Sequence, residues 1–222
     1  MEIVLVRHAQ PEWVADGRQV SNPGLTLRGF DQARRVGERL AFESFDEVHV
    51  SPLLRAQQTA APMARPTVTS EWLEEIRDPD WHGNPAEIVE RAFRDNRARH
   101  PAEAQWSGLE GGERVRDFID RIHDGSAKFL AERGIHRRDG ELPLWDIERP
   151  YRRFLFVAHA GVGAALLTHL LGLAPTPWEW ERFVIGHASI CRVEAIPVAG
   201  AHTFSLTKLS DVEHLPNELR TR

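Results

Sequence analysis

Short apolar runs and longer amphipathic stripes alternate along this chain of 222 residues. Glu2–Val6 and Phe154–Ala158 are apolar runs too short for a helix, so each predicts a buried strand. Gly111–Arg133 repeats apolar side chains at helical spacing, which predicts a long amphipathic helix. Alternating strands and helices are typical of an α/β fold. We expect further strands at Glu47–Val50, Val68–Thr69, Ser189–Ile196 and Thr203–Leu209, and further helices after Gly29, at Leu53–Met63 and at Gly161–Leu171.

Two segments interrupt this alternation. Residues from about Glu71 to about Trp106 are rich in Trp, Pro and charge and show no strand pattern. We interpret them as a helical excursion that caps one end of the sheet. Gly134–Arg153 is polar and punctuated by Gly and Pro, which predicts a surface loop. Because the chain also lacks an internal repeat, we expect a single domain over residues 1–222 that carries this cap-like excursion around 71–106.

Composition narrows the classes of function. The formal net charge is -5 and the basic residues are dispersed, so nothing favours a nucleic-acid partner. No apolar run approaches the ~18 residues of a membrane span, and the run near Glu2 is too short for a signal peptide. The single cysteine, Cys191, excludes an intrachain disulfide and is expected to be a buried core thiol. We therefore expect a cytoplasmic protein without a membrane or nucleic-acid partner.

Two of the predicted strands end in the same way. The first runs into Arg7 and His8, and the strand Phe154–Ala158 runs into His159. Ligands of α/β sheets bind outside the carboxyl ends of the strands, so these side chains are expected to meet there. Arg55 would join them from the helix that follows the second strand. A structural role is the simpler interpretation for four isolated histidines: His49, His100, His123 and His136.

Such a cluster suits phosphoryl transfer. Two guanidiniums match the oxygens of a phosphoryl group bidentately and need no metal ion. Their positive charge also lowers the pKa of a neighbouring imidazole, because it disfavours the protonated ring. A neutral imidazole nitrogen is a nucleophile, so the same charges bind phosphate and activate the attacking group.

Segments through almost the whole chain resemble those of the histidine phosphatase superfamily, which has the phosphoglycerate mutase-like fold. In the family's order they are Arg7-His8-Ala9, Leu25-Thr26-Leu27-Arg28-Gly29 with Gln32-Ala33, Ser51-Pro52-Leu53-Leu54-Arg55-Ala56-Gln57-Gln58-Thr59-Ala60, Leu73-Glu74-Glu75-Ile76 with Trp81-His82-Gly83, Gly111-Gly112-Glu113, and Val157-Ala158-His159-Ala160-Gly161. The resemblance implies a three-layer α/β sandwich, whose mostly parallel central sheet has helices on both faces.

The resemblance also implies a role for each matching residue. His8 attacks phosphorus in line and becomes a phosphohistidine. Arg7, Arg55 and His159 hold the equatorial oxygens, where charge develops. Glu75 protonates the leaving oxygen and then takes a proton from the attacking water, since microscopic reversibility lets one carboxyl do both.

Two of these assignments leave alternatives. Glu74 competes with Glu75 for the role of acid, and Glu75 is preferred because the family's acid directly precedes an apolar residue, here Ile76. Ser51 is expected to support the pocket at a neighbouring strand end, although capping of the next helix would also explain it.

The chain departs from the family pattern close to the nucleophile. Ala9 and Ala160 replace glycines, so a positive φ at either position would be strained. Val14 stands where many members have a phosphate-binding asparagine, and Pro11 replaces a usual Thr or Ser. Gln10 or a backbone N–H is the expected substitute donor. Substrate preference is therefore not transferred from the best-known members.

The rival readings have weaker support. Gly161–Leu166 resembles a dinucleotide fingerprint, but Leu166 takes the place of its third glycine. No metal-ligand spacing is present, so we expect neither a metal nor a cofactor. We predict a phosphomonoesterase that acts through phosphohistidine on a small phosphorylated metabolite, and the short cap favours net hydrolysis. The alternatives are a phosphoglycerate-type mutase and a catalytically weak phosphate-binding or interaction module on the same fold. The oligomeric state is not predicted.

Overall fold

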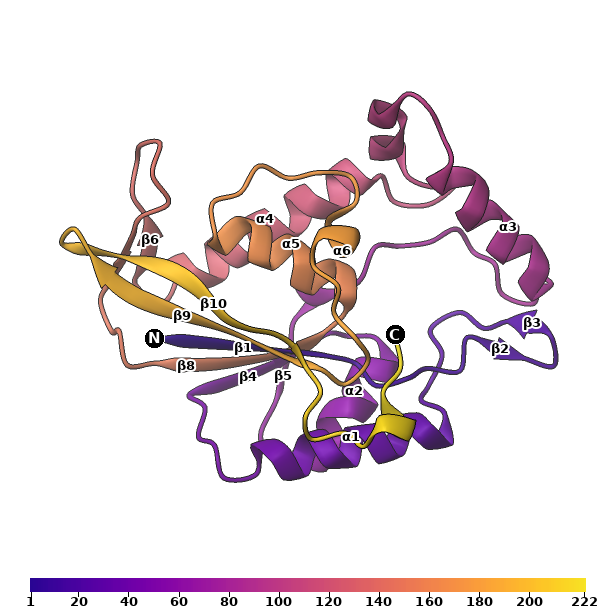
Figure 1. Cartoon of the computed structure of the whole chain (residues 1–222), viewed down its shortest axis with the longest axis horizontal. Coiled ribbons are helices and arrows are strands. Elements are labelled where there is room, and N and C mark those ends of the chain that lie inside the picture. Colours follow the sequence, from indigo (N-terminus) through magenta and orange to yellow (C-terminus); the bar gives the residue numbers. More distant parts are fainter.

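The computed structural model describes residues 1–222 and places an eight-stranded sheet between two layers of helices (Figure 1). The strand order is β5-β4-β8-β1-β9-β10-β7-β6; the first four are parallel to one another and the others are antiparallel to their neighbours. The predicted α/β fold is confirmed. The strands are β1 (Glu2–Arg7), β4 (Glu47–Val50), β5 (Val68–Thr69), β6 (Ile135–Arg137), β7 (Trp145–Ile147), β8 (Arg153–Ala158), β9 (Ile190–Val198) and β10 (Ala201–Asp211).

Helices cover both faces of this sheet (Figure 1). On one face lie α1 (Leu27–Leu40) and α2 (Leu54–Ala60), and on the other α4 (Val115–Ala131) and α5 (Ala160–Leu170). The remaining helical elements are α3 (Ala86–Arg97), α6 (Glu179–Arg182) and four 3₁₀ turns at Ala61–Met63, Glu71–Leu73, Ala102–Ser107 and Asn217–Leu219. No helix combines the length and apolarity that crossing a membrane requires.

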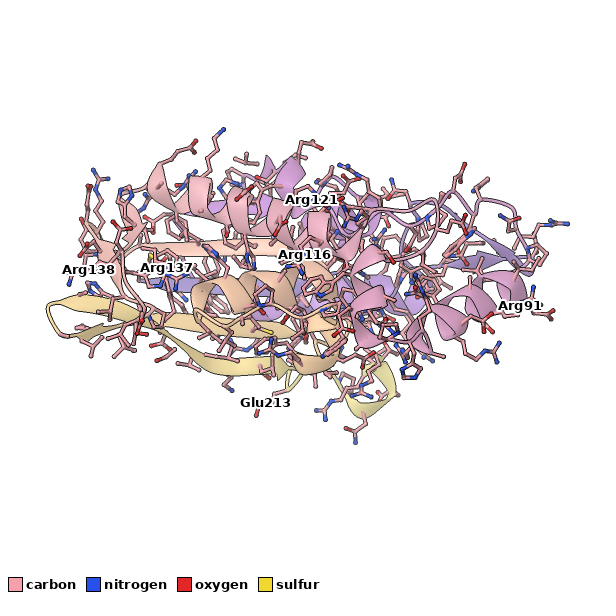
Figure 2. The ribbon with its side chains drawn as sticks, turned by 90° about the horizontal axis from the view of Figure 1, so that it is seen from above. Arg91, Arg116, Arg121, Arg137, Arg138 and Glu213 are labelled. Carbon is pink, nitrogen blue, oxygen red and sulfur yellow. The ribbon has the colours of Figure 1, made fainter.

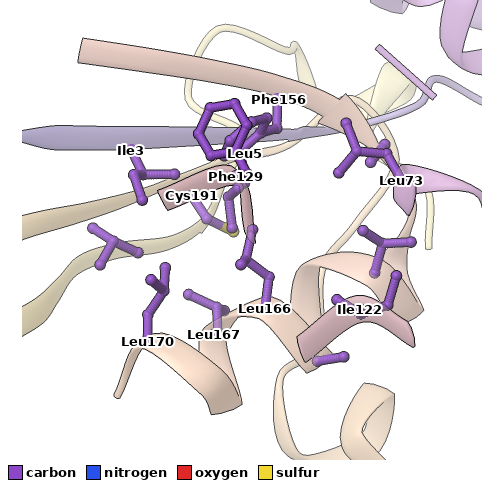
Figure 3. Close-up of a cluster of buried hydrophobic side chains, with 14 of the residues drawn as sticks. Ile3, Leu5, Leu73, Ile122, Phe129, Phe156, Leu166, Leu167, Leu170 and Cys191 are labelled. Atoms are coloured by element: carbon purple, nitrogen blue, oxygen red, sulfur yellow. The ribbon is translucent and has the colours of Figure 1, made fainter. Parts of the chain in front are cut away.

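Strand β8 shows why its sequence is continuously apolar. Phe154 and Phe156 pack into the core beneath α4 and α5, whereas Leu155 and Val157 pack into the core beneath α1 and α2. A central parallel strand is buried on both faces, so it has no polar alternation. Figure 3 shows Phe156 in the first core, together with residues of α4 and α5 and the buried thiol of Cys191.

The start of α1 is fitted closely to the loop that follows β1. Thr26 caps the helix, since its Oγ1 accepts a hydrogen bond from the Gly29 N–H at 2.9 Å. A Cβ on Gly29 would lie 2.2 Å from the carbonyl oxygen of Gln10, so only glycine permits this approach. The glycine at position 29 therefore lets the loop that follows His8 pack directly against the start of α1.

Segments beyond the carboxyl ends of the parallel strands pair with each other. A hairpin of β2 (Val14–Ala15) and β3 (Arg18–Gln19), which the sequence did not predict, lies beside the start of α3 (Figure 1). The Gln19 N–H donates to the carbonyl of Asn84 at 2.8 Å, and Ala86 N–H donates to the carbonyl of Gly17 at 3.0 Å.

The prediction of a surface loop over Gly134–Arg153 was wrong in part. The segment contributes β6 and β7, which close the edge of the sheet, and both Ile135 and Trp145 are buried. Each strand is only three residues long and the link between them is polar, so neither produced a recognisable apolar run.

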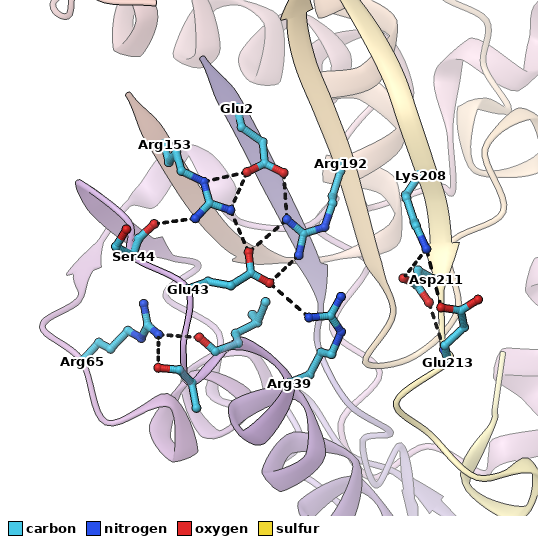
Figure 4. Close-up of polar contacts among 12 residues, drawn as sticks. Glu2, Arg39, Glu43, Ser44, Arg65, Arg153, Arg192, Lys208, Asp211 and Glu213 are labelled. Carbon is cyan, nitrogen blue, oxygen red and sulfur yellow. Dashed lines mark hydrogen bonds and ion pairs between the residues drawn. The ribbon is translucent and has the colours of Figure 1, made fainter. Parts of the chain in front are cut away.

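Charged side chains pair at the amino ends of the central strands. Glu43, which follows α1, accepts hydrogen bonds from Arg153 of β8 at 2.7 Å and from Arg192 of β9 at 2.6 Å (Figure 4). Arg192 also donates to Glu2 of β1 at 2.7 Å. Elsewhere basic side chains are spread over the molecule, with Arg91 and Arg138 near opposite ends (Figure 2).

Candidate active site

The ends of β1 and β8 bring two histidines together. The strands pair in parallel with Arg7 opposite Ala158, so His8 and His159 follow at neighbouring positions. Their ring centroids lie 5.0 Å apart, and the residues are only 3% and 2% exposed.

The His8 ring is oriented by the backbone carbonyl of the next residue, Ala9. Its Nδ1 lies 2.8 Å from the carbonyl oxygen of Ala9, which only accepts hydrogen bonds. Nδ1 therefore carries the proton, and Nε2 keeps its lone pair. Burial, followed by the charges of His159, Arg55 and Arg7, lowers the pKa of His8 well below its usual value. The ring is neutral and its Nε2 is available as a nucleophile.

Two guanidiniums flank these rings without a counter-ion. Arg7 Nη1 donates to the carbonyl of Ile185 at 2.6 Å. Arg55 is 4% exposed, and its guanidinium lies 4.7 Å from the ring centroid of Trp13. Burial lowers the pKa of each guanidinium to about 10, so both stay charged at neutral pH.

Neither arginine forms an ion pair with a carboxylate, although ion pairs are common elsewhere in the chain. The Nε atoms of Arg7 and Arg55 and the Nδ1 of His159 are buried and have no hydrogen-bond partner. Buried charges normally require a partner, so this cluster is suited to a multiply charged anion such as a phosphoryl group.

Glu75 and Glu74 have different surroundings. The Glu75 carboxylate accepts hydrogen bonds from the N–H groups of Gly161 at 2.9 Å and Ile76 at 3.0 Å. Burial raises the pKa of Glu75, although these N–H groups and the two site arginines oppose the shift. Glu74 instead accepts from Arg77 Nη2 at 2.6 Å and from Arg77 Nε at 2.9 Å. Only Glu75 is therefore a part-buried carboxyl without an ion pair beside the site.

Gly161 makes this position of Glu75 possible. A Cβ on Gly161 would lie 2.4 Å from Glu75 Oε1, so a side chain there would displace the carboxylate. Ala9 and Ala160 cause no such conflict, because neither adopts a positive φ.

The two expected supporting residues behave differently. Ser51 is fully buried and its Oγ lies 2.7 Å from His159 Nε2, so it orients that ring. The Gln10 side-chain oxygen accepts from Thr26 Oγ1 at 3.3 Å, at the start of α1, and its amide nitrogen is the group that could donate to phosphate. Val14 lies exposed on the β2–β3 hairpin. Ser51 Oγ also accepts from the Leu53 N–H at 3.3 Å, just before α2, so Ser51 contacts both the ring of His159 and the start of the helix. The next N–H, of Leu54, donates to Asn22 Oδ1 at 2.9 Å.

A third histidine belongs to the cluster and was not predicted. His187 Nε2 lies 3.0 Å from Arg7 Nη2, and its ring centroid is 5.6 Å from that of His8. Burial and the charge of Arg7 lower the pKa of His187 to about 3. His187 Nδ1 lies 3.0 Å from Thr221 Oγ1 near the carboxyl terminus.

The position of His187 follows from the direction of β9. This strand runs antiparallel to β1, so its amino end lies beside the carboxyl end of β1. The motif rule considers only residues that follow strands. His187 lies three residues before β9, and β9 is the antiparallel neighbour of β1. A search for histidines just before such a strand would have identified His187.

A cleft of about 270 Å³ opens beside Arg55 and Glu75. Its walls come from the segment around the β2–β3 hairpin and from the residues after Glu75, including Trp13, Asp78 and Trp81. No group of three or more His, Cys, Asp or Glu side chains is arranged to hold a metal ion.

Comparison with known proteins identifies the family to which the chain belongs. The model of the histidine phosphatase superfamily (branch 1) matches residues 3–199. The chain belongs to the histidine phosphatase superfamily. This confirms the family expected from the sequence motifs, and the segments that carried the resemblance lie within the matched range.

Curated relatives in this superfamily have different names. The chain is 29% identical over 128 residues to phosphoserine phosphatase 1 of Hydrogenobacter thermophilus; the match covers 55% of this chain and 61% of that protein, less than two thirds of the relative. It is 27% identical over 201 residues to a probable phosphoglycerate mutase of Salmonella choleraesuis, covering 87% of this chain and 85% of the relative.

Solved structures of superfamily members share the fold. An α-ribazole phosphatase from Shigella flexneri superposes with a TM-score of 0.69 and 23% identity over 95% of this chain and 96% of the other. A phosphoserine phosphatase mutant from Entamoeba histolytica gives a TM-score of 0.68 with 20% identity over 97% and 99% of the two chains. At this identity, the likeness establishes the α/β architecture alone.

Proposed function

We propose that this superfamily member hydrolyses phosphomonoesters through a phosphohistidine at His8, without a metal ion. One observation carries the proposal: a neutral imidazole with a free Nε2 lies among two buried guanidiniums that have no counter-ion. This is a nucleophile beside a site for a dianion. The phosphatase names among the relatives support the same class of reaction.

The first half-reaction transfers the phosphoryl group to the enzyme. His8 Nε2 forms a bond to phosphorus as the bond from phosphorus to the leaving oxygen breaks. Arg7, Arg55 and His159 stabilise the charge on the equatorial oxygens. Glu75, whose pKa is raised by burial, gives its proton to the leaving oxygen, so the organic product departs as an alcohol.

The second half-reaction restores the enzyme. Water attacks phosphorus and gives a proton to the Glu75 carboxylate. The bond between phosphorus and His8 Nε2 breaks, and inorganic phosphate leaves. Ser51 supports this cycle by orienting His159.

A mutase is the second candidate, because a probable phosphoglycerate mutase matches most of the chain. Such an enzyme must keep water away from its phosphohistidine, which requires a closed lid. The segment Gly134–Arg153 would be the extra material for a lid, but its strands β6 and β7 lie at the far edge of the sheet. We therefore propose net hydrolysis of a small phosphorylated metabolite, in the cytoplasm, by one domain whose segment 71–106 forms a cap.

Parallel assays on one preparation test this proposal. We expect phosphate release from p-nitrophenyl phosphate in the presence of EDTA, with little interconversion of 3- and 2-phosphoglycerate. Mutase turnover well above phosphate release would select the second candidate. Binding of inorganic phosphate without turnover of any ester would identify a non-catalytic phosphate-binding module instead.

A further inference from the structure

The cleft beside the phosphoryl pocket has an unbalanced charge. Asp78 and Asp80 lie on its wall, together with the pair formed by Glu74 and Arg77. Arg77 is occupied by Glu74, and no lysine or further arginine other than Arg55 lines the cleft. The only cation free to bind an anion is therefore the one at the phosphoryl end.

The two aspartates have different environments. Asp80 is fixed by the loops, since it accepts hydrogen bonds from Ser21 Oγ at 3.3 Å and from the His82 N–H at 3.1 Å. Asp78 has neither a hydrogen bond nor an ion pair through its side chain. Desolvation, followed by the charge of Glu75, raises the pKa of Asp78 to about 6, although the charge of Arg55 opposes the shift. The residue is exposed to the cleft and is mostly ionised at neutral pH. Asp78 is an unpartnered negative charge beside the acid of the proposed reaction.

Aromatic faces complete the cleft. Trp13 already accepts the Arg55 guanidinium over its ring at 4.7 Å, and Trp81 is held edge-on against Phe93 at 5.3 Å. Indole rings and carboxylates together attract organic cations. Arg55 indicates, separately from the aspartates, that a ligand binds at this end of the cleft. It lines the cleft, is only 4% exposed, and its Nε has no hydrogen-bond partner.

We propose that the alcohol part of the substrate carries an ammonium group, and that Asp78 selects it against esters whose alcohol part carries a carboxylate or a second phosphate. The substrate class is then the phosphorylated amino alcohols, with the phosphate at Arg7 and Arg55 and the ammonium beside Asp78 and Trp81, since the ring of Trp13 already faces Arg55. This inference rests on the proposed function for the placement of the phosphate.

Three esters of similar size differ in the charge of their alcohol part. Phosphoethanolamine carries an ammonium group, ethyl phosphate carries no charged group, and phosphoglycolate carries a carboxylate. Their binding to His8→Ala, which cannot consume them, is measured by calorimetry in competition with inorganic phosphate. We expect phosphoethanolamine to bind about tenfold tighter than ethyl phosphate, and phosphoglycolate to bind more weakly than both. Raising the salt concentration should narrow these differences.

Asp78→Asn in the same background tests the residue itself. The preference for phosphoethanolamine should fall to less than threefold, whereas Asp139→Asn, an equal charge change on an exposed loop at the other end of the molecule, should preserve it. Equal binding of the three esters, tighter binding of phosphoglycolate, no binding of any ester, or an unchanged preference in Asp78→Asn would each overturn the inference. Turnover of p-nitrophenyl phosphate by the unmodified chain is scored separately: its absence refutes the proposed function, whereas turnover with no preference for phosphoethanolamine refutes only the substrate class.

Discussion

At the scale of single residues, hydrogen bonding distinguishes His8, the proposed nucleophile, from the structural histidine His49. His49 is buried like His8, but both of its ring nitrogens have partners: Ser70 Oγ at 2.8 Å and Glu47 Oε2 at 2.9 Å. His8 uses only Nδ1, so one nitrogen remains for chemistry. A buried imidazole is therefore a candidate nucleophile only where its second nitrogen is free and cations keep it neutral.

The first prediction concerns the acid. Glu75→Gln should lower the turnover of alkyl phosphates by about 10²–10⁴-fold, because their leaving oxygens need a proton. The loss on p-nitrophenyl phosphate should be much smaller, since that leaving group departs without one. Steady-state kinetics on both esters measure the ratio, with Glu74→Gln as the matched control. Equal losses on both esters, or a defect that follows Glu74, would refute the assignment.

The second prediction concerns His187 as a positioning residue. His187→Ala removes a partner of the Arg7 guanidinium, and a hydrogen bond to a charged group contributes about 1.5–3 kcal/mol. We expect kcat/KM to fall about 10- to 100-fold, and the affinity for inorganic phosphate to fall with it. His187→Gln should restore part of both, since its amide oxygen also accepts from Arg7. Normal phosphate affinity in His187→Ala would show that the contact is only structural.

Most of the site, but not all, followed from rules that apply to single residues. Arg7, His8 and His159 were predicted because each adjoins the end of an apolar strand, where parallel strands place their ligands. Gln10 was expected to donate to phosphate; its side-chain oxygen accepts from Thr26, and a glutamine donates through its amide nitrogen, so this role stays a prediction. His187 was missed because its position depends on strand pairing, which periodicity does not report.

At the scale of elements, ion pairs connect the central strands to the loop after α1, away from the carboxyl ends of β1 and β8 where the site lies. Glu43 joins the loop after α1 to β8 and β9 through Arg153 and Arg192, and all three side chains are largely buried (Figure 4). Partly buried ion pairs with several contacts contribute more than isolated surface pairs, which contribute little.

The third prediction follows from this network. Glu43→Ala should lower the free energy of unfolding by about 1–2 kcal/mol, because three arginines, Arg39, Arg153 and Arg192, lose a shared carboxylate. The turnover number should not change, since the network lies at the amino ends of the strands. Urea denaturation measures the effect. Glu38→Ala, which removes a surface pair with Arg34, is the control and should change stability by less than about 0.5 kcal/mol. Equal effects of the two substitutions would contradict the prediction.

Elements were predicted well where they were long and buried. β8 and α4 were found because continuous apolarity and helical periodicity each extend over enough residues. The short strands β2, β3, β6 and β7 were missed, because two or three residues do not establish a period. β5 is equally short, but a strand was expected at Val68–Thr69. β2 and β3 pair with each other, as do β6 and β7, and β7 also pairs with β10. These strands depend on pairing, which hydrophobic periodicity does not report.

At the scale of the whole molecule, buried histidines link stability to pH. Six have a lowered pKa, chiefly through burial: His8, His123, His159, His169, His187 and His214. Their folded pKa lies below the unfolded value near 6.5, so the unfolded chain binds more protons as the pH falls. Asp78 and Glu75 have a raised pKa and act in the opposite direction.

The fourth prediction is a loss of stability on mild acidification. Stability is complete above about pH 6.5 and declines below it, by about 1.4 kcal/mol per pH unit for each additional proton that the unfolded chain binds. The two carboxyls offset only part of this decline, because the histidines outnumber them. Thermal melting between about pH 7.5 and 5 tests the sign, and a Tm that rises over this range on acidification would contradict it.

The central claim is that the phosphoryl group passes through His8. Incubation with a labelled phosphomonoester in EDTA, followed by rapid quenching in alkali and peptide mass spectrometry, tests it directly. We expect an acid-labile, alkali-stable phosphate on the peptide that contains His8, and neither label nor turnover in His8→Ala. Near-normal turnover by His8→Ala, label on another residue, or an absolute need for a divalent metal would contradict the account.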